Sequence, residues 1–324
     1  MTITTLNVAT YNIYNTTARY NERIPLLFSV LDRWCSDDGI SVVGLQECRF
    51  KISGGQRHDE AEKEKVDEVG KVLSGERSQL DAFMAMGWKN VIESRLQSPI
   101  LAPGDPTFRI DGNAFLTMHA DGGDYDGDGG DYDGDGTGDW LLLSSATHHI
   151  ATNRNAQIMT LQNTTDKELT VHIVNTHLHW STNVTGMSTR EDAKIRGEQF
   201  REVLRLTREI ASGGGDPIIL MGDFNLWFED ELIIDLFSEH GYRSCMKEAT
   251  GQEAFTVHKN LLAPTIDPEG VCEQKADFIL IRDGDKGKKF SVQGCGLSGC
   301  DAKDDDDTLY ASDHFGVWAK LTLN

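Results

Sequence analysis

The sequence has few of the features that would place it in a specialised class of protein. None of its apolar runs approaches the length of a membrane-spanning helix. The opening residues, MTITTLNVATYNIY, contain neither a basic stretch nor a long apolar stretch, so they do not resemble a signal peptide. The six cysteines form no CxxC pair and are too sparse for a disulfide framework. We therefore expect an intracellular, monomeric protein with no transmembrane segment.

Basic residues are also scarce. The chain has 31 lysine and arginine residues against 52 aspartate and glutamate residues, which gives a net charge of −21. Such an acidic chain is poorly suited to broad, sequence-independent binding of duplex nucleic acid. It remains compatible with an enzyme that meets phosphate through a bound cation. A small or single-stranded substrate fits this charge best, because fewer phosphates must be neutralised.

The apolar pattern predicts an α/β protein. The length suits one large domain over residues 1–324, and no change in composition divides the chain. Strands are predicted at 6–14, 40–47, 112–118, 140–146, 155–162, 170–179, 217–223, 276–281 and 315–323. Helices are predicted at 21–38, 190–211 and 230–240, with a charged, partly helical segment at 59–86. This order indicates layered sheets covered by helices, with 112–118 and 140–146 paired as a hairpin.

An acidic insert at 120–139 lies within this predicted hairpin and repeats the unit GGDYDGD. Asp124, Asp126 and Asp128 fall at positions 1, 3 and 5 of a calcium loop, and Asp135 falls at position 12, where glutamate is usual. The neighbours are predicted strands, so an EF-hand proper is not indicated. A Ca²⁺-ordered loop is one hypothesis. The other is a solvated flexible loop, which the glycine content and charge density favour.

The stretch VNTHLHW places polar groups at alternate positions of a predicted strand. Asn175, His177 and His179 would share one face, because side chains two residues apart in a strand point the same way. A strand with an amide and two imidazoles on one face could meet phosphate and sugar. For His179 the alternative is a polar side chain that simply lies beneath a loop.

Three further motifs end or begin apolar strands. LQE ends one strand in Glu47, which either holds a cation at the sheet edge or faces water. GDFN carries Asp223 and Asn225, which could orient a water molecule or form an Asp-Asn turn. SDH places His314 before the last strand, where Asp277 of the motif ADF could fix its tautomer. Asn12 in TYNIY is a buried amide that needs a partner, either structural or at a metal or phosphate.

Taken in order, these motifs resemble the endonuclease/exonuclease/phosphatase superfamily. The resemblance runs from about residue 6 to residue 323 and rests on TYNIY, LQE, NTH, GDFN, ADF and SDH. The stretches NTHLHW, ESR, DGNAF and NRNAQIMTLQ are most similar to its deadenylase–nocturnin branch. The resemblance implies a four-layer α/β sandwich, in which two packed mixed β-sheets are flanked by helices.

The resemblance also implies an activity. It indicates a Mg²⁺-dependent phosphoesterase, with Mn²⁺ as a possible substitute, that hydrolyses phosphodiester or phosphomonoester bonds. We favour a nuclease or nucleotide phosphodiesterase whose partner is a single-stranded nucleic acid or a nucleotide. One alternative is an inositol-polyphosphate phosphatase or a sphingomyelinase, although no amphipathic membrane-binding helix is evident. A further alternative is a catalytically silent calcium-binding or binding module.

Site residues follow from the same resemblance. Glu47 would be the principal Mg²⁺ ligand, with Asn12 and Asp313 close to the metal. Groups that would act in catalysis are Asp223 and Asn225 on the attacking water, His177 on the scissile phosphate, and His314 oriented by Asp277. Substrate contacts would come from Asn175, His179 and Arg154.

Overall fold

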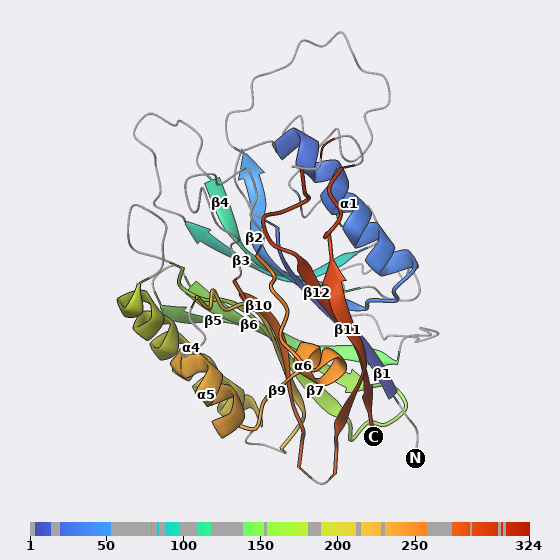
Figure 1. Cartoon of the computed structure of the whole chain (residues 1–324). Helices are drawn as coiled ribbons and strands as arrows, with labels where there is room; N and C mark the ends of the chain where they lie inside the picture. The colour runs from blue at the N-terminus through green and yellow to red at the C-terminus, as the bar shows by residue number, and fades with distance from the viewer. Residues whose placement is uncertain are drawn as a thin grey trace.

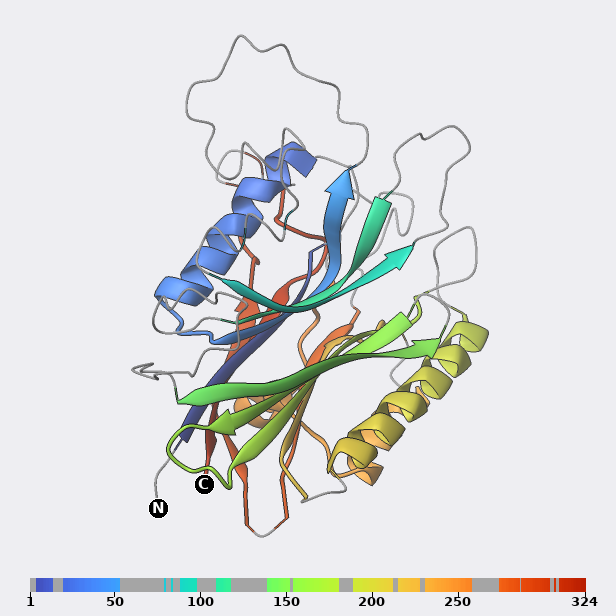
Figure 2. The same cartoon turned by 180° about the vertical axis from the view of Figure 1, so that it is seen from behind.

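The computed structural model confirms the predicted four-layer sandwich. It describes residues 4–13, 20–52, 79, 83, 88–97, 109–117, 139–151, 154–180, 189–211, 215–227, 231–257, 274–285, 287–303, 306 and 309–324. Two six-stranded mixed sheets pack face to face, and helices cover their outer faces. Figures 1 and 2 show both sheets edge-on between the helices, with the two termini close together at one end.

The first sheet contains both ends of the chain. Its strands are β1 (Thr4–Asn12), β2 (Val42–Ile52), β3 (Lys89–Gln97), β4 (Arg109–Thr117), β11 (Phe290–Ser298) and β12 (Gly316–Leu323). They lie in the order β11-β12-β1-β2-β4-β3. β1 and β2 are parallel, with Asn12 opposite Gln46, whereas β12 is antiparallel to β1. The N-terminal motif TYNIY therefore lies beside both LQE and the last strand.

The second sheet is formed by the middle of the chain. Its strands are β5 (Trp140–Ala151), β6 (Arg154–Asn163), β7 (Thr170–His177), β8 (Ile218–Asp223), β9 (Arg243–Ser244) and β10 (Asp277–Arg282). They lie in the order β5-β6-β7-β8-β10-β9. β7 and β8 are parallel, so His177 is opposite Asp223, and antiparallel β10 brings Asp277 opposite the same residue.

Helices cover the outer faces because each carries one apolar stripe. Helix α1 (Tyr20–Ser36) packs Leu27, Leu31 and Trp34 into a cluster with β1 and β2. Helices α4 (Arg190–Ala211) and α5 (Leu232–Glu239) share a cluster with β6, β7, β8 and β10. A short helix, α6 (Cys245–Thr250), lies near the end of the second sheet. None of the helices described combines the length and apolar composition that a membrane span requires.

The space between the sheets is filled by the inward-facing side chains of both. This cluster includes Val8 and Val42 of the first sheet and Ile173, Ile219 and Ile279 of the second, each at most 2% exposed. Because side chains alternate across a strand, the neighbours of these residues face the helices. The central strands are buried on both faces, which explains their nearly continuous apolar sequences.

The predicted hairpin between 112–118 and 140–146 is wrong. β4 pairs with β2 and β3 of the first sheet, whereas β5 pairs with β6 of the second. The acidic insert therefore joins one sheet to the other. Its possible calcium ligands, Asp124, Asp126, Asp128 and Asp135, lie outside the described residues.

Candidate active site

The amide of Asn12, at the end of β1, joins the two sheets. Its Nδ2 donates to Glu47 Oε1 at 3.2 Å and to Asp223 Oδ2 at 2.8 Å. Glu47 lies in β2, which is parallel to β1, while Asp223 ends β8 of the other sheet. Asn12 is 1% exposed; its bond to Asp223 is buried, whereas its bond to the half-buried Glu47 is partly buried. Two acidic side chains from different sheets are thus held on one buried amide.

Two histidines surround the same oxygen of Asp223. His177 Nε2 lies 3.5 Å from Asp223 Oδ2, and His314 Nε2 lies 3.9 Å from it. The other ring nitrogen of His314, Nδ1, is 2.8 Å from Asp277 Oδ2. This carboxylate fixes the tautomer, because Nδ1 must carry the proton that Asp277 accepts. The Asp–His pair that the sequence suggested between ADF and SDH is therefore formed.

The SDH motif is tied to the same centre through its serine. Ser312 Oγ donates to the backbone carbonyl of Asn12 at 2.7 Å, and the backbone N–H of His314 donates back to Ser312 Oγ at 3.2 Å. The half-buried Asp313 lies between them in sequence. Ser312 Oγ also lies 3.3 Å from Asp313 Oδ1, so the three predicted metal residues, Glu47, Asn12 and Asp313, are linked through contacts around Asn12.

The backbone of the site is unusual at two of the predicted site residues. Glu47 has φ 57° and Asn225 has φ 52°, both in the left-handed region that side chains disfavour. The amide N–H of Asn225 donates to Asp223 Oδ1 at 2.8 Å, and its Nδ2 donates to the Leu178 carbonyl at 3.0 Å. Strain of this kind persists where the surroundings over-determine a conformation, as they do in many functional sites.

Gly222 allows the approach of β8 to β7. Its φ is 140°, and a Cβ built there would lie 1.9 Å from the Thr176 carbonyl oxygen. No side chain could be accommodated at this distance without moving the backbone. The glycine of GDFN is therefore required so that Asp223 can reach His177.

Burial and charge shift the pKa values of three groups. Burial raises the pKa of Asp223 to about 7, with the nearby His314 opposing and Asp277 adding to the shift. Burial would lower the pKa of His314, but Asp277 and Asp223 raise it well above its ordinary value. Burial lowers the pKa of His177 well below its ordinary value, and Arg154, His314 and His179 lower it further. The site thus pairs a charged histidine with a neutral one.

The acidic groups fit a divalent cation. Ligand atoms of Asp223, Asp277 and His314 lie within 4.8 Å of one another, and this group could hold a metal ion. His314 Nδ1 is already bonded to Asp277, which favours a metal on the oxygen side of the site, towards Glu47. Asp277 Oδ1 is buried without a hydrogen-bond partner, and the raised pKa of Asp223 reflects charge that is not fully compensated. A bound cation would relieve both costs.

Asn175 is placed in the interior between the sheets. It is 0% exposed and accepts from Gln46 Nε2 at 2.6 Å, while its own Nδ2 donates to Gln157 Oε1 at 3.0 Å. Its side chain is therefore engaged within the protein, and we assign it a structural role instead of the predicted substrate contact. Gln46 precedes Glu47 and Asn175 lies two residues before His177, so this amide network fixes the floor of the site.

We predict that Asn175→Ala lowers the free energy of unfolding by about 1–3 kcal/mol, because it removes the buried hydrogen bonds that Asn175 makes with Gln46 and Gln157. Urea denaturation measures this change. Gln162→Ala is the matched control. It removes an exposed amide bond to the Lys167 carbonyl and should cost less than about 0.5 kcal/mol. Equal losses in both variants would contradict the structural role.

The two remaining predicted substrate residues lie at the edge of the site. β7 ends at His177, so His179 lies beyond the strand, where Nε2 is 2.8 Å from Asp192 Oδ1 of α4. Arg154 begins β6, is half-buried, and lies close enough to His177 to lower its pKa. Both residues are thus grouped near His177.

Sequence reasoning did not identify the polar residues of α4. Arg196 is 0% exposed and makes a bidentate ion pair with Glu231, at 2.6 and 2.9 Å. The sequence does contain a signal for Arg196, because this residue interrupts the apolar face from which the helix was predicted. Asp192 follows Thr189 by three residues, which is the spacing of a capping box.

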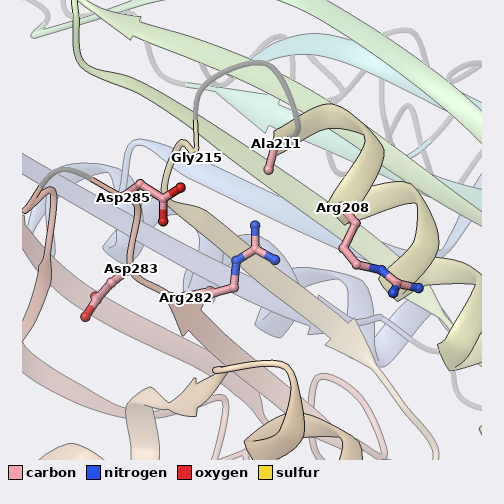
Figure 3. A pocket seen from close by; sticks show the side chains of 6 residues that line it. All are labelled: Arg208, Ala211, Gly215, Arg282, Asp283 and Asp285. Atoms are coloured by element: carbon pink, nitrogen blue, oxygen red, sulfur yellow. The ribbon is translucent and has the colours of Figure 1, made fainter.

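A separate hollow lies away from this cluster. It has a volume of about 360 Å³ and is lined by Arg208, Ala211, Gly215, Arg282, Asp283 and Asp285. Figure 3 shows Arg282 between Asp285 and the end of α4. Arg282 and Asp277 are at opposite ends of β10, about 17 Å apart along the strand. The hollow is therefore not part of the candidate site.

The two-sheet sandwich thus gathers carboxylates, amides and histidines at its strand ends. Residues 9–314 match the model of the Endonuclease/Exonuclease/phosphatase family, and the chain belongs to that family. Members of this family generally hydrolyse phosphoester bonds and typically depend on a divalent metal. The resemblance of the motifs is thereby confirmed. No curated protein matches the sequence.

Several solved structures share the fold. A family protein from Bacteroides thetaiotaomicron has a TM-score of 0.63 and 15% identity, covering 100% of this chain and 99% of that one. The catalytic domain of human nocturnin, with bound sulfate, has a TM-score of 0.62 and 16% identity, covering 100% and 97%. TDP2 from D. rerio, complexed with a single-strand DNA product, has a TM-score of 0.59 and 17% identity, covering 99% of both chains.

Proposed function

We propose that the protein is a Mg²⁺-dependent phosphoesterase that acts as a nuclease or nucleotide phosphodiesterase. The observation that carries this proposal is one continuous chain of polar contacts. It runs from Glu47 through Asn12 to Asp223, and from there through His314 to Asp277. This chain of contacts places the proposed cation site at its Glu47 end and the charged His314 beside Asp277 at its other end. A cation and a charged histidine could together offset the charge of a phosphoryl group that contacted both.

Glu47, Asn12 and Asp313 would hold the cation. Carboxylate and amide oxygens are the ligands that Mg²⁺ prefers, and Mn²⁺ accepts the same set. When bound, the cation offsets negative charge that develops on the phosphoryl oxygens. The bond from Asn12 Nδ2 to Glu47 leaves the amide oxygen of Asn12 as the atom that could serve as a ligand.

The remaining groups would act on water and phosphate. Asp223, whose Oδ2 lies beside both His177 and His314, is placed to accept a proton from an attacking water. Asn225 holds Asp223 Oδ1 through its backbone N–H, which fixes the direction of the carboxylate. His314 in its charged form would donate to a phosphoryl oxygen. His177, at the end of β7, would donate to the same group from the other sheet.

A single-stranded nucleic acid or a nucleotide is the substrate that the surface charge favours. The net charge of −21 opposes the close approach of a duplex, whose many phosphates would need basic partners. The D. rerio TDP2 structure, which has the same fold, was solved with a single-strand DNA product. Both observations support a substrate that presents few phosphates at once.

The test is Mg²⁺-dependent hydrolysis across a substrate panel. The panel contains poly(A), single- and double-stranded DNA, a 5′-tyrosyl oligonucleotide, a dinucleotide phosphate, a soluble inositol phosphate and sphingomyelin. We expect cleavage of a nucleic acid or nucleotide that chelation of the metal abolishes. Glu47→Gln, which keeps the shape of the side chain and removes its charge, should lower kcat on the order of 10³-fold.

Three outcomes would change the proposal. Cleavage of inositol phosphate or sphingomyelin alone would replace the nuclease assignment with a non-nucleic phosphoesterase. Full activity in Glu47→Gln would show that the cation is held elsewhere. Silence of the folded wild-type protein on every substrate, with Mg²⁺ and with Mn²⁺, would indicate a binding module.

A further inference from the structure

The loop that leads into β12 is held in place by side chains and not by a sheet. Residues 311–313 belong to no strand, and β12 begins only at Gly316. Ala311 is 2% exposed and Ser312 is 0% exposed, so the backbone groups of this loop need partners within the protein. The position of Asp313 therefore depends on the groups that bind the backbone beside it.

Two contacts with the N-terminal part of the chain hold this loop. Arg23 of α1 donates from Nη1 to the Ala311 carbonyl at 3.1 Å, in a buried bond, and Ser312 Oγ donates to the Asn12 carbonyl at 2.7 Å. Ala311 also packs in the apolar cluster of α1. Figures 1 and 2 show the segment before β12 beside that helix. Asp313 directly follows both anchored residues, so a shift of either anchor would displace it.

The same arginine lies close to Asp313. Both act on the hydroxyl of Tyr11, which is buried and has no hydrogen-bond partner among the described residues. Burial raises the pKa of Tyr11, Cys300 and Asp313 add to the shift, and Arg23 opposes it. Arg23 is 2% exposed, and a buried guanidinium costs free energy unless hydrogen bonds and opposite charge compensate it. A nearby carboxylate such as that of Asp313 reduces this cost.

We propose that Arg23 is a positioning residue of the cation site, which holds the Ala311 carbonyl so that Asp313 is fixed where it can act as a ligand together with Glu47. This inference rests on the proposed function. A ligand that is already in place loses little freedom when the cation binds, whereas a displaced loop must be ordered at that moment. Binding of the cation, and not the chemical step, should therefore depend on Arg23.

The experiment measures Mn²⁺ binding to the full chain without substrate, through the electron paramagnetic resonance signal of the free ion. Mn²⁺ accepts the oxygen ligands that Mg²⁺ uses. Because the chain is acidic throughout, Glu47→Gln is titrated in parallel, and only the binding that this variant loses is assigned to the site.

Three variants are compared with the wild type. Arg23→Met removes the donor to Ala311. Arg23→Gln also removes the long charged side chain but keeps a polar group, which makes the test possible if methionine prevents folding. Arg196→Met is the matched control, because it removes a buried arginine of another helix, α4, that bonds to Glu231 and the Trp180 carbonyl.

We expect both Arg23 variants to raise the Kd for Mn²⁺ at the site about tenfold, the effect of one lost hydrogen bond to a charged group. At saturating Mg²⁺ the kcat should change less than about threefold, because the loss is in cation binding. Arg196→Met should lower the urea midpoint and leave the Kd unchanged. The double variant Arg23→Met/Asp313→Ala should bind Mn²⁺ as Asp313→Ala does, because Arg23 acts through Asp313.

The outcomes separate this inference from the proposed function. If the Arg23 variants lose stability but bind Mn²⁺ as the wild type does, Arg23 is a structural residue and the inference is overturned, whether or not phosphoesters are hydrolysed. Additive losses in the double variant would overturn it as well. If the Kd rises as expected but no substrate of the panel is cleaved, the inference stands and the proposed function fails. If Glu47→Gln binds Mn²⁺ as the wild type does, both the proposed cation site and this inference are overturned.

Discussion

His314→Ala is expected to lower kcat by about 10²–10⁴-fold, the range for loss of a positioned acid–base group. The reason is the position of the ring, with Nδ1 held by Asp277 and Nε2 directed towards Asp223 Oδ2. Alanine removes the donor without a large change in fold, because the backbone bond from His314 to Ser312 remains. Steady-state kinetics on the substrate identified by the panel measures the loss. A urea midpoint close to that of the wild type would show that the variant is folded.

Asp277→Asn tests the electrostatic part of the same role. Asp277 is the main group that raises the pKa of His314, and burial acts in the opposite direction. Removing its charge should therefore lower the pKa of His314, so the ring loses its proton at a lower pH. If the charged ring is required, the alkaline limb of the kcat profile moves to lower pH, and activity recovers partly on acidification. An unchanged profile would show that His314 acts in its neutral form.

Arg196→Met is expected to lower the free energy of unfolding by about 3–5 kcal/mol, because it leaves the charge of Glu231 buried without the opposite charge of Arg196 beside it. Both side chains of the ion pair are 0% exposed, and Arg196 also donates to the Trp180 carbonyl. Urea denaturation monitored by tryptophan fluorescence measures the loss. Arg205→Met on the same helix is the control. Its ion pairs with Glu202 and Glu209 are exposed, so the change should cost less than about 1 kcal/mol.

The double variant Arg196→Met/Glu231→Leu should regain much of the stability that the single variant loses. With both charges removed, no uncompensated charge stays buried in this pair, and apolar side chains of similar size fill the space. If the double variant is as unstable as Arg196→Met, the lost bonds to the chain after β7 would account for the effect, and not the uncompensated charge.

Periodicity predicted the elements that have one apolar face. The helix predicted at 190–211 has the bounds of α4, and the strand predicted at 217–223 differs from β8 by one residue at its start. β11 was missed because its alternate positions Gly294 and Gly296 leave no apolar pattern. The indole of Trp318 lies over both, and a Cβ at Gly296 would be 2.8 Å from that ring, whereas one at Gly294 would be in ordinary contact with it at 3.5 Å. The glycine at position 296 is thus required by a side chain on another strand, and the local sequence does not indicate this contact.

Strand alternation indicated which polar residues face the same way but not what lies opposite them. Asn175 and His177 are two residues apart in β7, yet one is enclosed by amides of the other sheet and the other reaches Asp223. The difference depends on how far the first sheet extends over the second. The predicted pairing of 112–118 with 140–146 was wrong because closeness in sequence does not decide which sheet a strand joins. The motif set indicated the family because its order does not depend on such contacts.

The left-handed backbone at Glu47 has a consequence for how this protein would respond to selection. A residue with a side chain held at φ 57° costs about 1–3 kcal/mol, which glycine would not incur. Glu47→Gly should therefore raise the melting temperature while abolishing hydrolysis, and differential scanning calorimetry of the two proteins would measure it. A library screened for heat resistance alone would be enriched in such inactive chains, so thermal robustness and turnover are in direct competition at this position. A lower melting temperature in Glu47→Gly would show instead that the carboxylate contributes more to the fold than its conformation costs.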